Sequence, residues 1–410
     1  MKNKIAKNIL LVTSANFPFG GAGANVLRLL TTGLVKNNRN VDVLIQRGKR
    51  FGKKSNLGMK NGRIGGVFYA YCGYLARPEN YIKKIADSCA GMFVPPLIVL
   101  RKKLGGKIDC VLVYNGTAYE CIPLIIICKI LRIPIINHVV EWYEKETVAN
   151  SWWKLPAWWD FLFRMKVLNR YFAGLMVTSN FLKKYYTKRH MSDERIFVLP
   201  NLVNFSIFDS RGIHGSKNRS IRIGYCGTPT RKDGINDLLS AFQIVLKKNP
   251  DSELFVIGDT TGNKSVLPKL KEISKLLEIF DKVTFTGLVE WEQMPSLLNS
   301  CDILILARPS GRFAEAGFPT KLGEYMACKK PVVVTKVGDI PLYLRDKESA
   351  MLVEPNNPES IASGICYLID YPEKAKKIGD KGYIWARNKL DYTKATQDIG
   401  QFLDTFKYVL

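Results

Sequence analysis

The stretch GFPTKLGEYMACKKPVVVT, residues 317–335, places Gly317 and Pro319 directly before a helix-forming run that contains Glu324. Proline suits the first turn of a helix, because the N–H that it lacks would be unpaired there in any case. The backbone N–H groups of such a turn point outward with the positive end of the helix dipole and can bind an anion. A carboxylate about one turn further on can accept two hydrogen bonds from a vicinal diol, as in ribose. The pattern predicts a site for a phosphorylated ligand; the alternative is that Glu324 only complements the helix dipole.

Two further loops place glycines between a strand and a helix. In the early loop SANFPFGGAGANVLRLL, Gly20 and Gly21 let the backbone approach a ligand and leave the amides at the helix start free. The spacing is not the G-x-G-x-x-G pattern of dinucleotide-binding folds, so a tight turn is the alternative. In the later loop GYCGTPTRKDGINDLL, Gly227 precedes Arg231 and Lys232, and cations beside a helix start suit a diphosphate. Taken alone, the later loop is equally well explained as a solvated turn.

Short apolar runs alternate with amphipathic segments and predict the elements that must position these loops. Near-continuous apolar strands separated by helices indicate parallel sheets covered on both faces. Two series of such strands indicate two doubly wound domains, joined by the polar segment at 199–220. Ligands of such domains bind at the carboxyl ends of the strands. The predicted strands are 7–14, 40–46, 108–115, 132–139 and 173–179, then 221–227, 253–259, 282–287, 302–307 and 330–335.

The composition is that of a globular chain with a large excess of positive charge. The 410 residues carry a net charge of +25, which favours nucleic acid, an anionic membrane or phosphorylated substrates as partners. Nine cysteines without a C-x-x-C pair indicate isolated thiols in a reducing cytoplasm, and three histidines without clustered cysteines give no zinc pattern. The N-terminus is interpreted as a first strand rather than a signal peptide, and no apolar run is long enough to span a bilayer.

Taken in order, the motifs resemble those of the retaining glycosyltransferases of family 4 (group 1), which have the GT-B fold and use nucleotide-sugar donors. The resemblance covers nearly the whole chain and rests on the early glycine-rich loop, VLPNLVNFSIF, YCGTPTRKDGINDLLSAF, VTFTGLV, EAGFPTKLGEYMACKKPVVVT and GDIPLYL. It implies two doubly wound, Rossmann-like α/β domains that face each other across a cleft. Residues 1–205 would bind the acceptor and face the membrane, residues 206–390 would bind the donor, and a helix at 391–410 would cross back to the N-terminal domain.

By position, the resemblance also implies roles for individual residues. Glu324 would hold the ribose hydroxyls, and Lys232 would reach the diphosphate. The loop at Gly20 and Gly21 would close over the phosphates from the other domain. His138 matches a family position near the transferred sugar. Backbone groups that would line the phosphate and the sugar belong to Gly317, Phe318, Thr320, Lys321 and Leu322.

The sequence departs from the family pattern at two places. The family pairs two Glu residues with seven residues between them, but Ala316 stands at the first position and Glu315 lies one residue earlier. Glu315 is the candidate for that catalytic place; the alternative is that the contacts of this loop differ. After Gly227, the family's usual Arg is replaced by Thr228, and Asp233 stands where a Lys is usual.

No Asp-x-Asp motif occurs in the chain, so sugar transfer without a metal or another cofactor is expected. The resemblance implies retention of the anomeric configuration. In a front-face route the leaving diphosphate takes the acceptor proton, and no protein nucleophile is required. His138 would then orient the sugar rather than act as a base; the alternative is a hydrogen-bonded structural histidine. Glu141 is a second candidate beside the sugar.

Cations and tryptophans gather in the first half of the chain. Residues 46–63 carry seven cations and no acid, and residues 151–190 carry eight Lys or Arg and one acid, Asp160. Such a combination is typical of a membrane interface, where rings lie among headgroups and cations meet anionic lipid. We expect peripheral binding to the inner face of the plasma membrane and a lipid-linked or membrane-associated glycan acceptor of polysaccharide or glycolipid biosynthesis. The alternative is that the rings fill the N-terminal core. The tryptophans expected at the membrane are Trp152, Trp153, Trp158 and Trp159.

Three other functions fit the sequence less well than a transferase. A nucleotide-sugar epimerase would need acid and base carboxylates, and no motif supplies a clear pair. A phosphorylase would need a phosphate site in place of the nucleoside, which leaves Glu324 unexplained. A basic nucleic-acid-binding protein is permitted by the charge. However, the chain has no RNP-like, zinc-finger or K/R-rich helical signature, and we expect no nucleic-acid partner.

Overall fold

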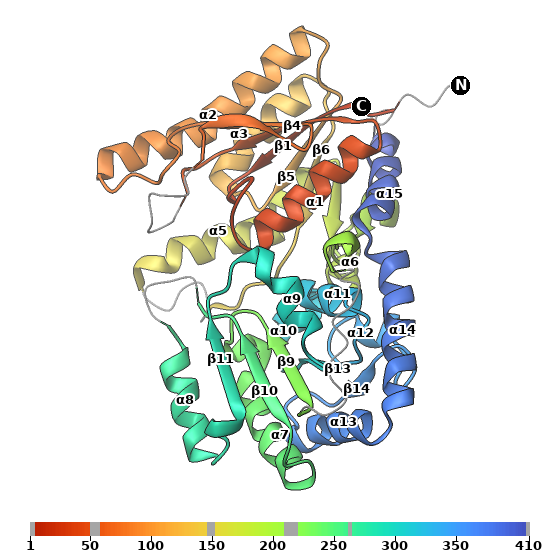
Figure 1. Cartoon of the computed structure of the whole chain (residues 1–410). Helices are drawn as coiled ribbons and strands as arrows, with labels where there is room; N and C mark the ends of the chain where they lie inside the picture. Colours follow the sequence, from red (N-terminus) through yellow and green to blue (C-terminus); the bar gives the residue numbers. More distant parts are fainter. Residues whose placement is uncertain (1–4, 50–57, 146–151, 209–219, 261–264, 407–410) are drawn as a thin grey trace. The chain divides into compact units, whose positions relative to one another are not determined.

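The computed structural model describes residues 5–49, 58–145, 152–208, 220–260 and 265–406. It divides the chain into two compact units, Met1–Leu202 with Tyr392–Leu410, and Val203–Asp391. Figure 1 shows the elements of both units. The sequence placed the corresponding boundaries after residues 205 and 390.

The N-terminal unit is built on a sheet of eight strands in the order β3-β4-β2-β1-β5-β6-β7-β8. β3 and β4 pair antiparallel, and the remaining neighbours pair parallel. The inner strands are buried on both faces, as their continuous apolar sequences require. The strands are β1 (Asn8–Thr13), β2 (Asn40–Ile45), β3 (Asn61–Ile64), β4 (Val67–Tyr71), β5 (Cys110–Tyr114), β6 (Ile135–Val139), β7 (Gly174–Val177) and β8 (Ile196–Val198).

Helices cover both faces of this sheet. The crossover from β1 to β2 runs in one direction along the sheet, and the crossovers from β4 onward run in the other. Because such crossovers are right-handed, the helices of the two series lie on opposite faces. α1 (Ala22–Lys36) lies on the first face. The second face carries α2 (Tyr81–Leu104), α3 (Ala118–Ile130), η2 (Trp152–Lys154), α5 (Leu155–Lys166), η3 (Leu168–Tyr171) and α6 (Asn180–Thr187).

The last helix of the chain, α15 (Tyr392–Thr405), packs beside α1 in the N-terminal unit (Figure 1). Its Asp404 forms a bidentate ion pair with the buried Arg39, at 2.8 and 2.9 Å. A Cβ at Gly33 of α1 would lie 2.5 Å from the Oγ1 of Thr396, so the two helices approach closely. The C-terminal helix is thus part of the hydrophobic core of the first unit.

The C-terminal unit contains a parallel sheet of six strands in the order β11-β10-β9-β12-β13-β14. Alternate residues of one strand reach two different cores: Ile303 and Ile305 of β12 lie in one, Leu304 and Leu306 in the other. The strands are β9 (Arg222–Cys226), β10 (Glu253–Ile257), β11 (Val283–Gly287), β12 (Ile303–Leu306), β13 (Val332–Thr335) and β14 (Met351–Val353). The helices are α7 (Ile235–Lys248), α8 (Leu267–Leu276), α9 (Met294–Asn299), α10 (Arg312–Ala316), α11 (Thr320–Ala327), α12 (Ile340–Tyr343), α13 (Pro358–Asp370) and α14 (Pro372–Lys389).

All ten strands expected from the sequence are present, and β3, β4, β8 and β14 were not expected. The prediction of two Rossmann-like α/β domains is confirmed. Within the described ranges, none of the helices combines the length and the apolar character that crossing a bilayer requires.

Candidate functional site

In the C-terminal unit the strand order reverses between β9 and β12, because β10 and β11 lie on one side and β13 and β14 on the other. Doubly wound sheets bind ligands at such a switch point, at the carboxyl ends of the strands. Two loops leave the sheet there, one after β9 and one after β12. Together with α11 they contain all the residues of this unit that the sequence predicted to bind a donor.

The loop after β9 approaches its neighbours closely at two of its glycines. A Cβ at Gly227 would lie 2.1 Å from the Cε of Lys321, and one at Gly234 would lie 1.7 Å from the carbonyl O of Ala307. Gly234 also has a φ of +68°, which residues with a Cβ rarely adopt. The glycines therefore allow this loop to pack against α11 and the end of β12.

An ion pair lies beneath this loop. The Nζ of Lys321 pairs with Asp233 and donates a hydrogen bond of 3.3 Å to the Tyr225 hydroxyl. The Tyr225 hydroxyl lies 2.7 Å from the Oδ2 of Asp233 and 2.9 Å from the carbonyl O of Thr228. Burial and the Asp233 carboxylate raise the pKa of Tyr225 well above its usual range, so the hydroxyl keeps its proton. Asp233, which stands at the family's Lys position, is therefore the counterion of Lys321.

Glu324 lies one turn beyond the first residue of α11. Within the described part of the chain its carboxylate has no hydrogen-bond or ion-pair partner, and the residue keeps part of its surface exposed. Burial raises the pKa of Glu324 to about 7, and the Lys321 ammonium opposes this shift. Because the carboxylate is accessible and has no protein partner among the described residues, it is a candidate acceptor for ligand hydroxyls.

α11 is fixed to the switch point by its own buried tyrosine. The Tyr325 hydroxyl accepts a hydrogen bond of 2.7 Å from the N–H of Cys226 and donates one of 3.0 Å to the carbonyl O of the same residue. Cys226 is the last residue of β9. The helix that carries Glu324 is thus held against the strand from which the glycine loop departs.

Two of the predicted donor-lining residues have buried side chains. Phe318 packs against Tyr343 and Trp385, with ring centroids 5.8 and 6.5 Å away, and Leu322 is fully buried. Such side chains hold the segment before α11 in place. Any contact of Phe318 and Leu322 with a ligand would therefore come from their backbone, as the resemblance implied.

The remaining predicted residues of this unit lie around the same two loops. The Nζ of Lys232 lies 5.7 Å from the centroid of the Phe313 ring. Glu315 accepts a hydrogen bond of 3.4 Å from the backbone N–H of Gly338, after β13. Arg231 begins the short helix η6 (Arg231–Asp233), and its side chain lies outside the described part of the structure.

In the N-terminal unit, the strand order reverses between β1 and β5, and the predicted glycine loop leaves the end of β1. Gly20 and Gly21 are exposed, and Gly21 is the residue before α1. A Cβ at Gly23 would lie 3.5 Å from the Tyr114 hydroxyl, and the ring of Tyr114 meets His138 edge to face at 5.2 Å. One tyrosine thus connects the glycine loop with the predicted histidine.

His138 is a buried, uncharged side chain. It is 2% exposed, and in the described ranges both ring nitrogens lack a hydrogen-bond partner. Burial lowers the pKa of His138 to about 3, so the ring is neutral at physiological pH. The alternative of a hydrogen-bonded structural histidine therefore does not describe this ring. A role beside the sugar stays a prediction.

The four predicted membrane tryptophans differ in their surroundings. Trp152 and Trp159 are 77% and 66% exposed. Trp158 is half-buried and stacks on Phe161, with ring centroids 5.5 Å apart, which fits the alternative of a core ring. The side chain of Trp153 lies outside the described residues.

Two further observations on this site concern metal binding and the ion pair between Asp233 and Lys321. Among the described residues, no group of three or more His, Cys, Asp and Glu side chains is placed to hold a metal ion. The link between Asp233 and Lys321 was not predicted, although the acid in the usual Lys position was a sign that this loop carries different contacts.

Comparison with known proteins supports this description. Residues 206–385 match the family model of glycosyl transferases group 1. The chain is 24% identical over 220 residues to the D-inositol 3-phosphate glycosyltransferase of Segniliparus rotundus, a match that covers 52% of this chain and 47% of that protein. It thus spans about half the length of this curated relative.

Two solved structures resemble the whole chain. A glycosyltransferase from Rickettsia africae has a TM-score of 0.71 at 16% identity, covering 98% of this chain and 99% of the other. Anabaena HepE in complex with UDP-glucose has a TM-score of 0.68 at 17% identity, covering 97% and 100%. The predicted GT-B fold is confirmed, and the matched proteins bear names that agree with the predicted enzyme class. The chain has the fold of GT-B glycosyltransferases, and its residues 206–385 match the group 1 family of glycosyl transferases.

Proposed function

We propose that this chain is a retaining, metal-independent glycosyltransferase of family 4. It moves a hexose from a nucleoside-diphosphate sugar to a lipid-linked or membrane-associated glycan. The observation that carries the proposal is the carboxylate of Glu324, which has no partner among the residues that the structure describes. It lies one turn beyond the start of α11 at the switch point of the sheet. The UDP-glucose bound by HepE, a protein of the same fold, is the kind of donor that this site suits.

Each part of the site has a role in this proposal. Glu324 accepts hydrogen bonds from the two ribose hydroxyls. The loop after Gly227, with Arg231 and Lys232, and the start of α11 face the diphosphate with N–H groups and positive charge. Lys321 adds an ammonium group, which is paired with the Asp233 carboxylate in this structure.

In the transfer step, the bond between the anomeric carbon and the diphosphate oxygen breaks, and the acceptor oxygen bonds to that carbon on the same face. The acceptor proton passes to the leaving diphosphate. The protein supplies no nucleophile in this route, and its cations stabilise the charge that develops on the diphosphate. The neutral ring of His138 serves the sugar by hydrogen bonding rather than by proton transfer.

A screen of nucleotides and nucleotide sugars by thermal unfolding tests the proposal. A ligand at about 100 times its Kd adds about 2.7 kcal/mol of stability. In a unit of this size that corresponds to a rise in Tm of roughly 5–10 °C. We expect UDP or GDP and one of their hexose conjugates to give this rise, and turnover of the conjugate to require an acceptor. Fast turnover without any acceptor would contradict the proposal.

The charge of Asp233 provides a second test. Replacing it by Asn leaves Lys321 without its counterion, and we expect the affinity for UDP to rise by about tenfold at low salt. The gain should shrink as salt is added, because added ions screen the extra charge. Isothermal titration of Asp233→Asn at two salt concentrations measures both effects.

The matched control is Asp251→Asn, which removes an exposed acid in the same unit. This control should leave the affinity for UDP unchanged. A loss of affinity in Asp233→Asn would mean that the acid positions Lys321 rather than neutralising it.

A further inference from the structure

Exposed apolar side chains are concentrated on one layer of the N-terminal unit. Of the 25 large apolar side chains exposed in the described residues, 14 belong to α2, α3, η2, α5 and η3. These five elements, here called the outer layer, cover the same face of the sheet and follow one another along it. Monomeric proteins rarely expose so much apolar surface in one region without a function.

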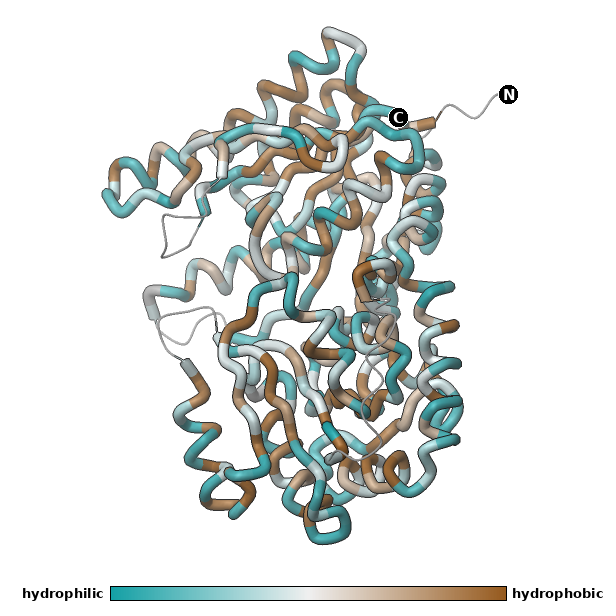
Figure 2. Tube along the Cα trace, viewed as in Figure 1, coloured by the Kyte–Doolittle hydropathy of each residue, from teal (hydrophilic) through white to brown (hydrophobic). Residues whose placement is uncertain are grey.

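α2 shows this most clearly. It is 24 residues long, about 36 Å, and apolar segments recur along it in Figure 2. Its buried positions are few and lie four residues apart: Asp87, Gly91, Pro95 and Val99. A Cβ at Gly91 would lie 2.4 Å from the carbonyl O of Gln46, so the helix backbone itself rests on the sheet.

The larger side chains of α2 are therefore directed away from the core. Ile82, Phe93, Leu97 and Leu104 are all exposed, and Phe93 and Leu97 are 53% and 63% exposed. At 100° per residue these positions fall within one arc of the helix. Surface helices of water-soluble proteins carry polar residues on this arc.

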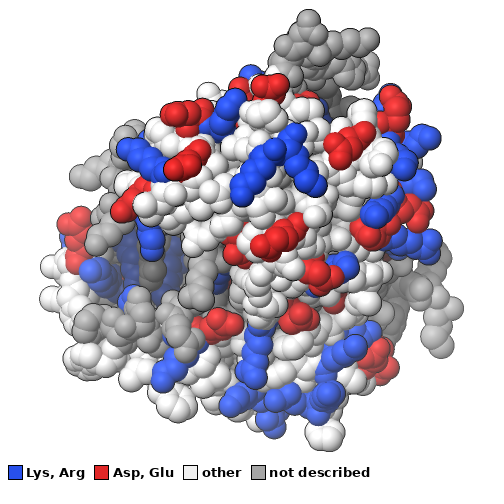
Figure 3. Space-filling view, turned by 90° about the horizontal axis from the view of Figure 1, so that it is seen from below, with Lys and Arg blue, Asp and Glu red and all other residues white. Residues whose placement is uncertain are grey.

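The charges of the outer layer are mostly positive. Its elements carry ten Lys or Arg and three acids. Asp87 is buried and accepts from the N–H groups of Gly48 and Tyr74, Glu120 is fully buried against Arg47, and Asp160 accepts from the N–H of Ala118. By contrast, the face drawn in Figure 3 carries acidic and basic side chains interspersed.

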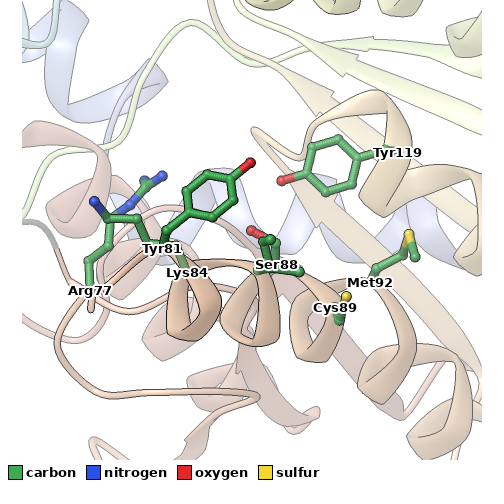
Figure 4. Close-up of a pocket in the computed structure, with 8 residues that line it drawn as sticks. Arg77, Tyr81, Lys84, Ser88, Cys89, Met92 and Tyr119 are labelled. Carbon is green, nitrogen blue, oxygen red and sulfur yellow. The ribbon is translucent and has the colours of Figure 1, made fainter. Parts of the chain in front are cut away.

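A pocket of about 380 Å³ opens where α2 begins, with mostly apolar walls. Figure 4 shows Arg77 and Lys84 beside it, and the rings of Tyr81 and Tyr119 with their hydroxyls directed toward each other. Two cations and two phenols beside apolar walls suit the headgroup and the first methylenes of a phosphorylated amphiphile.

We propose that the outer layer docks on the surface of an anionic bilayer, with the exposed stripe of α2 entering the headgroup region. An anionic bilayer has a hydrophobic interior and a negatively charged surface. The apolar side chains of the outer layer can enter the first, and its cations can pair with the second. The exposed rings of Trp152 and Trp159 belong to the same layer, so they are part of the contact rather than the whole of it.

The charge argues against the other occupants of this layer. A second copy of the chain would bring two cationic layers together, and their repulsion would oppose a dimer. A nucleic acid would meet the cations but would leave Phe93 and Leu97 exposed to water.

Flotation with vesicles of phosphatidylcholine, with and without phosphatidylglycerol, tests the inference. The wild type is expected to float with the anionic vesicles and to detach as salt is added. The double variant Phe93→Glu, Leu97→Glu should lose about tenfold or more of its partitioning, because it places two carboxylates in the headgroup layer. Both residues are exposed, so its thermal unfolding should match that of the wild type.

The matched control is Leu276→Glu, Ile384→Glu, which changes two exposed apolar residues on α8 and α14 of the C-terminal unit. It should float like the wild type. Equal flotation of the α2 variant and the wild type would overturn the inference. So would concentration-dependent dimerisation that only the α2 variant abolishes.

The inference rests on the membrane part of the proposed function, and its readout uses neither a nucleotide nor an acceptor. A wild type that ignores both kinds of vesicle would overturn the docking surface together with the membrane acceptor. Binding of UDP by the same preparation would then show that the donor site is present even though the membrane contact is not.

Discussion

Replacing Glu324 by Gln is expected to lower the affinity for UDP or GDP by about 100-fold or more. A carboxylate that accepts two hydroxyl hydrogen bonds contributes about 1.5–3 kcal/mol through each, and an amide oxygen replaces them poorly. Each 1.4 kcal/mol corresponds to a factor of ten. Isothermal titration of the variant and the wild type with the same nucleotide measures the change.

The nucleotide itself can be varied to confirm which group Glu324 binds. The wild type should bind 2′-deoxy-UDP much more weakly than UDP, because one of the two hydroxyl donors is missing. Glu324→Gln should bind both nucleotides with similar, low affinity. If the variant still distinguished the two nucleotides as strongly as the wild type, Glu324 could not be the group that holds the ribose.

The same substitution should stabilise the empty protein above neutral pH. Burial raises the pKa of Glu324 from 4.5 to about 7, so the folded state binds this proton more tightly than the unfolded state does. The stability that the group contributes is fully present below pH 4.5 and is lost as pH rises towards 7. Gln does not ionise, so the difference in Tm between Glu324→Gln and the wild type should grow across this window and level off above it.

Glu359→Gln is the matched control for both effects, because Glu359 is an exposed acid in the first turn of α13. It complements the dipole of α13, which follows the edge strand β14 rather than a strand of the switch point. The control should change neither the affinity for UDP nor the dependence of Tm on pH. Equal losses of nucleotide affinity in the two variants would favour the alternative that Glu324 merely complements its helix.

The sequence predicted the sheets well because buried parallel strands are continuous apolar runs. The segment 253–259 was expected as a strand, and β10 spans Glu253–Ile257. One missed strand, β4 (Val67–Tyr71), is itself an apolar run and was overlooked. The other three lack a long apolar run: β3 (Asn61–Ile64) contains one apolar residue, and β8 and β14 have three residues each. Pairing with a neighbouring strand, which a local pattern does not record, forms such short elements.

Contacts between residues that are far apart in the chain could not be predicted for the same reason, because a local sequence pattern does not record them. The partners Asp233 and Lys321 are 88 residues apart and meet because their loops leave adjacent strands. The neutral state of His138 also depends on burial by several elements. Composition identified the tryptophans of the N-terminal unit but could not separate the stacked ring of Trp158 from the exposed rings of Trp152 and Trp159.

Gly234→Ala is expected to destabilise the C-terminal unit by more than about 3 kcal/mol. A Cβ there would lie 1.7 Å from the carbonyl O of Ala307, and a backbone oxygen at the end of β12 cannot move without disturbing the sheet. The positive φ of +68° adds about 1 kcal/mol of strain. Thermal unfolding should show the loss as a fall in Tm of roughly 6–12 °C.

Gly287→Ala separates the two causes. Gly287, at the end of β11, has a φ of +72°, but a Cβ there would meet nothing within 4 Å. It should therefore lose only the strain of the positive φ, about 1 kcal/mol. The difference between the two variants then measures the close approach of the glycine loop to β12.

Because this loop carries Lys232 and Asp233, Gly234→Ala should also weaken UDP binding, whereas Gly287→Ala should not. Equal stability losses would mean that the loop relaxes around the new methyl group, and the switch point would then not be the tightly packed site on which nucleotide binding depends.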